Sequence, residues 1–156
     1  MSRSQRRVWN KNQDLTLRIS APPSTDRERV ALFNRHRLER GLSKKRLGTD
    51  GYHAWLSQSW TESYEFAWYL DQKLVMASIL DVGKGSSSAV YCYYDPSMGK
   101  RSLGTYGILH GIHWGQKRGL KYHYLGLHVA QNTHLSYKAK YTPHERLIDG
   151  AWTRFD

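Results

Sequence analysis

The sequence contains a single cysteine, Cys92, among 156 residues. One cysteine excludes an intramolecular disulfide framework and any zinc site built from several thiolates. No apolar run approaches the roughly 20 residues of a membrane-spanning helix, and no signal-peptide pattern precedes the domain. The Gly-rich stretch at residues 83–88 lacks the Gly-Lys-Ser/Thr spacing of a phosphate-binding P-loop. We therefore expect a cytoplasmic protein with no membrane partner.

Acidic residues are also few. Asp and Glu number 13 against 24 Lys and Arg, which gives a net charge of +11. Such an excess favours a polyanionic partner, nucleic acid before a membrane surface, although it could simply keep the protein soluble. Arg3, Arg6 and Arg7 fall in residues 1–20, where we predict a mobile basic arm and an edge strand over 14–19. The remainder, residues 21–156, is expected to form one domain.

The rest of the chain alternates between predicted helices and strands. A helix rich in both apolar residues and arginine covers residues 25–40, and its arginines predict a solvated face or an RNA-backbone contact. A weaker helix follows at 49–60. Strands are predicted at 64–70 and 73–81, joined by the tight turn Asp71-Gln72, and a flexible connection at 83–88 leads to a third strand.

Residues 89–141 read as strand, turn, helix, strand and a final short helix. The strand 89–94 is stopped by Asp95-Pro96, a helix runs from Ser102 to about Gly119, and a second strand covers 121–128. A strand–helix–strand unit of this length is a parallel crossover. An antiparallel meander that leads into such a crossover predicts an α/β (α+β) protein with the acetyltransferase-like (GNAT) fold.

Five ordered motifs resemble a known family. They are Val90-Tyr-Cys-Tyr-Tyr-Asp-Pro96, Ser102-Leu-Gly-Thr-Tyr106, Tyr122-His-Tyr-Leu-Gly126, Tyr137-Lys-Ala-Lys-Tyr-Thr-Pro143 and Asp149-Gly-Ala-Trp152. Together they resemble the C-terminal domain of the arginyl-tRNA–protein transferases, including the bacterial leucyl branch. The resemblance implies a GNAT fold that accepts aminoacyl-tRNA in place of acetyl-CoA and moves the amino acid onto an N-terminal amine.

Two features differ from that family. Its N-terminal region carries a cysteine cluster, whereas no cysteine precedes Cys92, so we expect this chain to lack that region. The segment Ala130-Gln-Asn-Thr-His-Leu135 stands where the family has a Cys and a Lys-Met pair. The acceptor could therefore be a protein, a peptide or a small-molecule amine.

The first candidate site is the turn that opens the helix at Ser102. Gly104 allows close backbone approach, while Ser102 and Thr105 could bond the phosphate or ribose of a terminal adenosine. Lys100 and Arg101 add positive charge, and Leu103 and Tyr106 complete the motif. A simple Ser/Thr helix cap is the alternative.

The second candidate site lies along the two central strands. Tyr91, Tyr93 and Asp95 share one face of the first strand by alternation, as do Tyr124, Gly126 and His128 of the second. These tyrosines could line an aminoacyl pocket or stack on adenine, or they could be core residues. Tyr137 and Lys138 of the last helix could meet the single-stranded end of a tRNA, or form a solvated helix end.

Aminoacyl transfer needs a group that accepts the proton of the attacking amine. Asp81 follows an apolar strand face, where an acid needs a partner, and could instead bind a cationic aminoacyl side chain, which favours arginine. The candidate catalytic residues are Asp81, Tyr93, Tyr124 and His128. His110 and His113 are three residues apart, but no cysteine or acidic ligand accompanies them, so we expect no metal.

Three functions follow from these residues. An aminoacyl-tRNA-dependent transferase, using arginyl-tRNA and no cofactor, is favoured. An acetyl-CoA-dependent N-acetyltransferase would need Gly or Ala where Tyr106 stands. A tRNA-binding module without catalysis would keep the basic surface alone.

Overall fold

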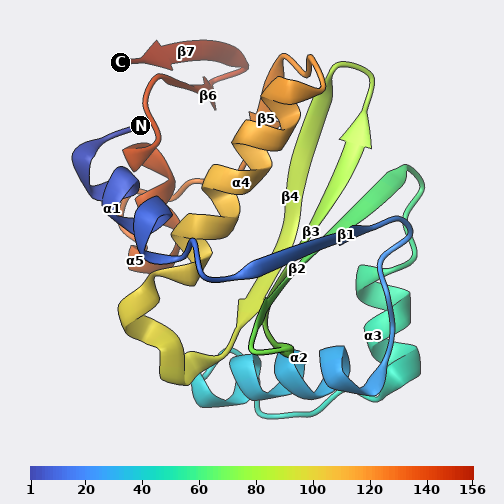
Figure 1. Cartoon of the computed structure of the whole chain (residues 1–156). Helices are drawn as coiled ribbons and strands as arrows, with labels where there is room; N and C mark the ends of the chain where they lie inside the picture. The colour runs from blue at the N-terminus through green and yellow to red at the C-terminus, as the bar shows by residue number, and fades with distance from the viewer. The chain divides into compact units, whose positions relative to one another are not determined.

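The computed structural model describes all 156 residues, in two compact units. The larger unit, Ser2–Tyr124, contains a five-stranded sheet in the order β1-β2-β3-β4-β5 (Figure 1). Its strands are β1 (Thr16–Ser20), β2 (Glu62–Leu70), β3 (Lys73–Gly83), β4 (Ser86–Tyr94) and β5 (Tyr122–Tyr124). Neighbours are antiparallel except β4 and β5, which are parallel. The predicted meander, crossover and edge strand are confirmed.

Tight turns connect the antiparallel strands. Asp71 and Gln72, between β2 and β3, have φ values of 46° and 65°, which match the two positive-φ positions of a type I′ hairpin turn. Gly85, between β3 and β4, has a φ of 77°. The predicted flexible connection at 83–88 is wrong, because Ser86 to Ser88 already belong to β4 and pair with both neighbouring strands.

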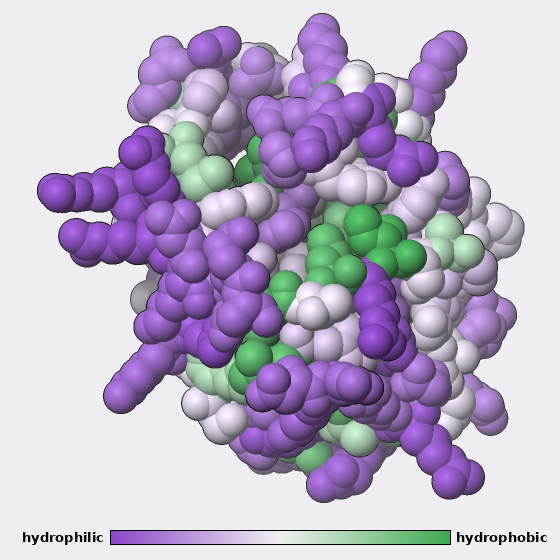
Figure 2. Space-filling model, viewed as in Figure 1, coloured by the Kyte–Doolittle hydropathy of each residue, from purple (hydrophilic) through white to green (hydrophobic).

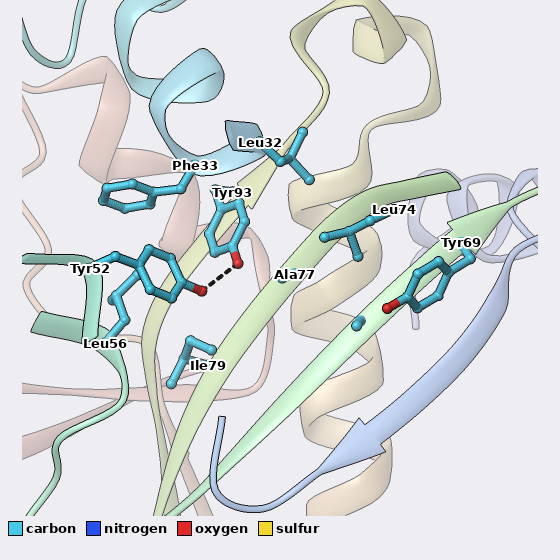
Figure 3. Packing of buried hydrophobic residues seen from close by; sticks show 10 residues of the cluster. Leu32, Phe33, Tyr52, Leu56, Tyr69, Leu74, Ala77, Ile79 and Tyr93 are labelled. Carbon is cyan, nitrogen blue, oxygen red and sulfur yellow. Dashed lines mark hydrogen bonds between the residues drawn. The ribbon is translucent and has the colours of Figure 1, made fainter. Parts of the chain in front are cut away.

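Helices cover both faces of this sheet. Residues of α2 (Arg27–Glu39) and α3 (Thr49–Leu56) share a core cluster with Ala77, Ile79 and Tyr93 (Figure 3). On the other face, α4 (Leu103–Lys117) contributes Leu103 and Tyr106 to a second cluster. The alternation of side chains along β3 and β4 thus supplies an apolar layer to the helices on each face of the sheet.

The basic N-terminal segment is ordered, contrary to the mobile arm predicted from its composition. Residues Arg3–Lys11 form α1, which begins with a capping box between Ser2 and Gln5. Trp9 stacks on His110 of α4 with ring centroids 4.4 Å apart. Composition did not reveal this helix because only Val8 and Trp9 provide its apolar contact.

The smaller unit, Leu125–Asp156, is grouped with Met1. It contains α5 (Thr133–Ser136), a 3-10 turn η2 (Tyr137–Lys140) and the hairpin β6 (His144–Ile148) and β7 (Ala151–Phe155). The hairpin was not predicted, although its turn, Asp149-Gly150, has the positive φ values of 48° and 80° expected of such a dipeptide. The strand predicted over 121–128 is limited to Tyr122–Tyr124. None of the helices in either unit is both long enough and apolar enough to cross a membrane.

Candidate active site at the open edge of β4

The parallel pair β4 and β5 separates soon after it begins. Only Ser86, Ser87 and Ser88 of β4 have partners in β5, so residues 89–94 continue without a strand neighbour on that side of the sheet. On the β3 side, Ile79 pairs with Tyr91 but Leu80 pairs with Ala89, which leaves Val90 as an extra residue in the ladder. Bulges redirect backbone groups and are frequent next to active sites. At the end of this edge the His36 ring contacts both the Tyr94 N–H and the Tyr94 carbonyl, so the backbone left without a partner from β5 or His36 is that of residues 89–93.

A helix N-terminus lies at the end of this open edge. The chain leaves β4 through the 3-10 turn η1 (Pro96–Arg101) and enters α4 at Ser102, whose φ and ψ of 53° and 46° are left-handed. The Ser102 side chain makes no capping hydrogen bond, and Tyr106 is the first residue whose N–H bonds within the helix, to the Ser102 carbonyl at 3.1 Å. The N–H groups of residues 103–105 thus have no partner within the helix, whereas the Ser102 N–H donates to the Gly99 carbonyl at 3.2 Å. An added Cβ on Gly104 would lie 3.5 Å from the Tyr94 ring.

The other residues of this turn have different surroundings. Lys100 is exposed, and Thr105 is half-buried. Arg101 donates to both carboxylate oxygens of Asp14 at 2.8 Å, which binds η1 to the segment after α1. Leu103 is a core residue, and the buried Tyr106 hydroxyl donates to the Asn12 carbonyl at 3.1 Å. Arg101, Leu103 and Tyr106 therefore shape the turn, while Lys100 and Ser102 are exposed and Gly104 and Thr105 are half-buried.

Tyr91, Tyr93 and Asp95 lie on the face covered by α2. Tyr93 is fully buried, and its hydroxyl lies 2.6 Å from that of Tyr52 (Figure 3). Burial raises the pKa of Tyr93 well above its ordinary value, so this hydroxyl is not a base near neutral pH. Tyr91 is half-buried and packs on Trp55 with ring centroids 5.0 Å apart. Tyr91 is therefore the more accessible of the two tyrosines on this face of β4.

Asp95 is a buried cap rather than an open ligand-binding acid. It accepts hydrogen bonds from Ser97 and from both terminal nitrogens of Arg35, at 2.5 and 3.0 Å. Burial opposes ionisation, but the Ser97 hydrogen bonds and the Arg35 charge hold the pKa of Asp95 below its ordinary value. The carboxylate thus fixes η1 against α2.

Asp81 belongs to a polar row across four strands. Ser63 of β2, Asp81 of β3, Ser88 of β4 and Tyr124 of β5 are successive lateral partners, so all four share one face of the sheet. Ser63 donates to the Asp81 carboxylate. Tyr124 is 40% exposed and two strands from Asp81, which corresponds to about 10 Å. The sheet register thus brings these two predicted catalytic residues to the same face.

Two arginines, Arg37 of α2 and Arg40 at its C-cap, were not singled out by sequence analysis. Arg40 donates to the Tyr94 hydroxyl at 2.9 Å. The Arg37 guanidinium lies over the rings of Phe33 and Trp55, at 4.9 and 5.4 Å from their centroids, and its Nη1 has no hydrogen-bond partner. Nothing in the sequence distinguishes them from the other arginines of α2, because their contacts are with residues distant in the chain.

The remaining predicted residues belong to the smaller unit. His128 is half-buried, and its pKa is lowered by desolvation and by the charges of Arg146, His144 and Lys138. Lys138 donates to the Leu127 carbonyl at 2.6 Å, and desolvation lowers its pKa. Gly126 has a φ of 75°, and Tyr137 is 38% exposed. A neutral His128 can accept a proton, whereas the Lys138 ammonium is already bonded within its own unit.

The described residues offer no activated thiol. Burial raises the pKa of Cys92 to about 12, so its sulfur stays protonated. No group of three His, Cys, Asp or Glu side chains lies close enough to hold a metal ion. The larger unit instead combines an uncapped helix N-terminus, an open strand edge and the Asp81 carboxylate.

The sequence of this chain matches a known protein family and several of its members. Residues 28–148 match the family described as arginine-tRNA-protein transferase, C terminus. The chain is 34% identical over 158 residues to an aspartate/glutamate leucyltransferase of Acinetobacter baumannii, covering 100% of this chain and 58% of that relative. It is 36% identical over 159 residues to an enzyme of the same name from Saccharophagus degradans, covering 99% and 66%. The chain thus spans about three fifths of the length of these relatives.

The fold is shared with acetyltransferases. The ribosomal-protein-S18-alanine N-acetyltransferase of Escherichia coli superposes with a TM-score of 0.59 and 17% identity, over 84% of this chain and 79% of that one. This similarity confirms the predicted GNAT fold. Together with the family match, it shows that the chain belongs to the arginine-tRNA-protein transferase C-terminal family.

Proposed function

We propose that this chain is the catalytic domain of an aminoacyl-tRNA-dependent transferase, which moves leucine from charged tRNA to the N-terminal amine of an acidic acceptor peptide. The single observation that carries the proposal is the open edge of β4, which leads to the uncapped N-terminus of α4. Family membership supplies the class of donor. Charged tRNA is a co-substrate, and we expect the reaction to occur in the cytoplasm without a cofactor.

The donor's terminal adenosine fits the open edge. Its phosphate would bind the free N–H groups at residues 103–105 and the exposed Lys100, because helix N-termini favour anions. The separated strands leave β4 backbone groups to hold the aminoacyl ester. The half-buried Tyr91 and the exposed Tyr124 offer ring faces for the base or the amino acid side chain.

The chemistry is aminolysis of an ester. The neutral acceptor amine attacks the carbonyl carbon, a tetrahedral intermediate forms, and the ribose oxygen leaves with a proton as the amide bond forms. Positioning and stabilisation of the oxyanion supply most of the rate enhancement in such reactions. The amine must lose a proton, and we assign its acceptance to Asp81, with the neutral His128 as the alternative.

Leucine replaces arginine as the proposed amino acid. The preference for arginine depended on Asp81 binding a cationic side chain, whereas here Asp81 is assigned the acceptance of a proton from the amine. Both reported relatives are named leucyltransferases that act on aspartate or glutamate. We therefore propose a peptide with N-terminal Asp or Glu as the acceptor in place of a small-molecule amine.

Acetyl transfer is the second candidate, because a solved structure of the same fold is an N-acetyltransferase. Tyr106 argues against it. This residue stands where the acetyl-CoA loop needs Gly or Ala, and its buried ring and hydroxyl bond fix it beneath the turn. Arg101, the other charged residue of the turn, is occupied by Asp14.

The test is transfer of a labelled group to a peptide panel. Leucyl-tRNA, arginyl-tRNA and acetyl-CoA would each be mixed with the protein and peptides that begin with Asp, Glu, Asn or Ala. Leucine in the Asp and Glu peptides alone is the expected result. Acetylation without aminoacylation would overturn the proposal, and tRNA binding without transfer would indicate a binding module.

The Asp81→Asn variant tests the proposed base. We expect kcat to fall by about 10²- to 10⁴-fold, with little change in the KM for leucyl-tRNA. Ser63→Ala is the matched control, since it removes the hydrogen bond to Asp81 but keeps the carboxylate. Retention of the full kcat in Asp81→Asn would exclude Asp81 as the proton acceptor. The role would then pass to His128, and kcat should fall in the His128→Gln variant instead.

A further inference from the structure

The outer face of α1 carries a stripe of arginines. Arg3, Arg6 and Arg7 are exposed and spaced by three or four residues, so they share one side of the helix. None of the three takes part in a salt bridge or a side-chain hydrogen bond. In Figure 2, long hydrophilic side chains project at the left, where Figure 1 draws α1.

This stripe does not help α1 to fold. Arg3 and Arg7 are like charges at positions i and i+4, which repel. The first turn contains no acidic residue, and positive charge there opposes the helix dipole. The helix is held instead by its capping box and by the packing of Val8 and Trp9. A ligand that neutralises the stripe would therefore remove an unfavourable interaction.

The helix is anchored beside the anion-binding turn. Lys11 donates to the Lys100 carbonyl at 2.7 Å, and Asn12 donates to the Arg101 carbonyl at 3.0 Å. Arg101 in turn pairs with Asp14, and Tyr106 of α4 donates to the Asn12 carbonyl. These bonds hold the C-terminal end of α1 at η1, immediately before the α4 N-terminus. The arginine stripe thus begins at Arg7, about 6 Å along the helix from Lys11, and extends away from this turn to Arg3.

We propose that α1 is a rigid binding surface for the phosphate backbone of the donor tRNA, next to its aminoacylated 3′ end. The inference rests on the proposed function for the identity of the polyanion. Arg3 and Arg7 are four residues apart, about 6 Å along the helix, which spans about two phosphates of one nucleic-acid strand. Arginine forks bind phosphate oxygens in a bidentate manner, and such contacts are independent of base sequence.

The experiment compares two triple variants of the full chain. Arg3→Gln/Arg6→Gln/Arg7→Gln removes three charges from α1, and glutamine preserves helix propensity. Lys44→Gln/Lys45→Gln/Arg46→Gln removes three charges from the exposed segment between α2 and α3, two helices that pack on the opposite face of the sheet from α1. The probe is fluorescent leucine-specific tRNA without an attached amino acid, titrated at several salt concentrations. Thermal melts verify that both variants are folded.

We expect the α1 variant to bind tRNA roughly 20- to 100-fold more weakly at 0.1 M salt, with the slope of log affinity against log salt reduced by about 1.5 to 2. The control should lose much less. An unchanged slope in the α1 variant, or an equal loss in the control, would overturn the proposal. So would tighter binding of the wild type to vesicles of phosphatidylglycerol than to tRNA.

The wild-type transfer assay separates the two proposals. Leucine transfer by the unaltered protein, with full tRNA affinity in the α1 variant, would refute the surface and keep the function. Weakened tRNA binding by the α1 variant, with no transfer by the unaltered protein, would keep the surface and refute the transferase.

Discussion

Two helices of this protein are rich in arginine, and they use it differently. In α2, Arg29 is 7% exposed and pairs with the fully buried Glu65, while Arg35 pairs with the buried Asp95. In α1, Arg3, Arg6 and Arg7 are exposed and form no ion pair. Arg29 and Arg35 join α2 to buried acids of other segments, whereas the three α1 arginines remain available to a partner.

The difference shows that arginine content alone does not identify a nucleic-acid surface. Whether an arginine is structural depends on an acid supplied by another part of the chain, as β2 supplies Glu65 and the end of β4 supplies Asp95. No acidic residue lies in or directly next to α1.

The largest effect is expected at Arg29. Its replacement by Ala would leave Glu65 charged and buried without its partner, and should lower the free energy of unfolding by about 3 to 5 kcal/mol. Denaturant titration measures this loss. In the double variant Arg29→Met/Glu65→Met most of the stability should return, because no unpaired charge remains. A loss below about 1 kcal/mol in Arg29→Ala would contradict a structural role.

The second largest effect is expected from acid, which should lower the free energy of unfolding through His36 of α2. Burial lowers the pKa of His36 to about 4, below the value of about 6.5 in an unfolded chain. The unfolded state therefore binds the proton first, and stability should fall as the pH drops from about 6.5 to about 4, by at most about 3 kcal/mol from this residue. Desolvation also lowers the pKa values of the half-buried His110 and His123.

Urea unfolding at several pH values would measure this dependence. A His36→Gln variant, whose side chain does not titrate, should flatten the curve between pH 6.5 and 4. An unchanged slope in that variant would show that His36 is protonated in the folded protein.

A smaller effect is expected from the buried tyrosine pair. Tyr93→Phe leaves the Tyr52 hydroxyl without its partner and should cost about 1 to 3 kcal/mol, whereas Tyr52→Phe/Tyr93→Phe should be nearly neutral. The double variant should also keep its transferase activity, because the hydroxyl of Tyr93 is buried away from a substrate. Loss of activity in the folded double variant would restore Tyr93 as a catalytic candidate.

The smallest effect on stability is expected in α1. The variant Arg3→Gln/Arg6→Gln/Arg7→Gln removes repulsion and an unfavourable dipole interaction, so its melting temperature should equal or slightly exceed that of the wild type. Calorimetry measures this directly. A clear fall in melting temperature would mean that these arginines are structural, like those of α2.

Much of the fold could be predicted from the sequence, because it depends on local signals. The Asp71-Gln72 turn, the Asp95-Pro96 stop and the Gly119 helix end each act over a few residues, and all lie where predicted. Alternation along β4 correctly grouped Tyr91, Tyr93 and Asp95 on one face. The register that places Asp81 level with Ser63, Ser88 and Tyr124 depends on strand pairing and could not be inferred from spacing.

The candidate site was less predictable for the same reason. Arg101 and Asp95 resemble ligand-binding residues in sequence, but Asp14 and Arg35 occupy them from 87 and 60 residues away. The N-terminal helix was missed because its apolar stripe is only Val8 and Trp9, and because its docking surface is the distant α4. Long-range pairing therefore decides which charged groups remain open to a substrate.

The most direct test of this account is the single-turnover rate of leucine transfer to a peptide with N-terminal Asp, measured over a range of leucyl-tRNA concentrations. The wild type and the α1 triple variant should reach the same maximal rate, with half-saturation in the variant at a tRNA concentration at least tenfold higher. This result would place tRNA capture on α1 and catalysis outside it. Equal half-saturation with a lower maximal rate would contradict the separation of these roles, and absence of transfer by the wild type would contradict the function itself.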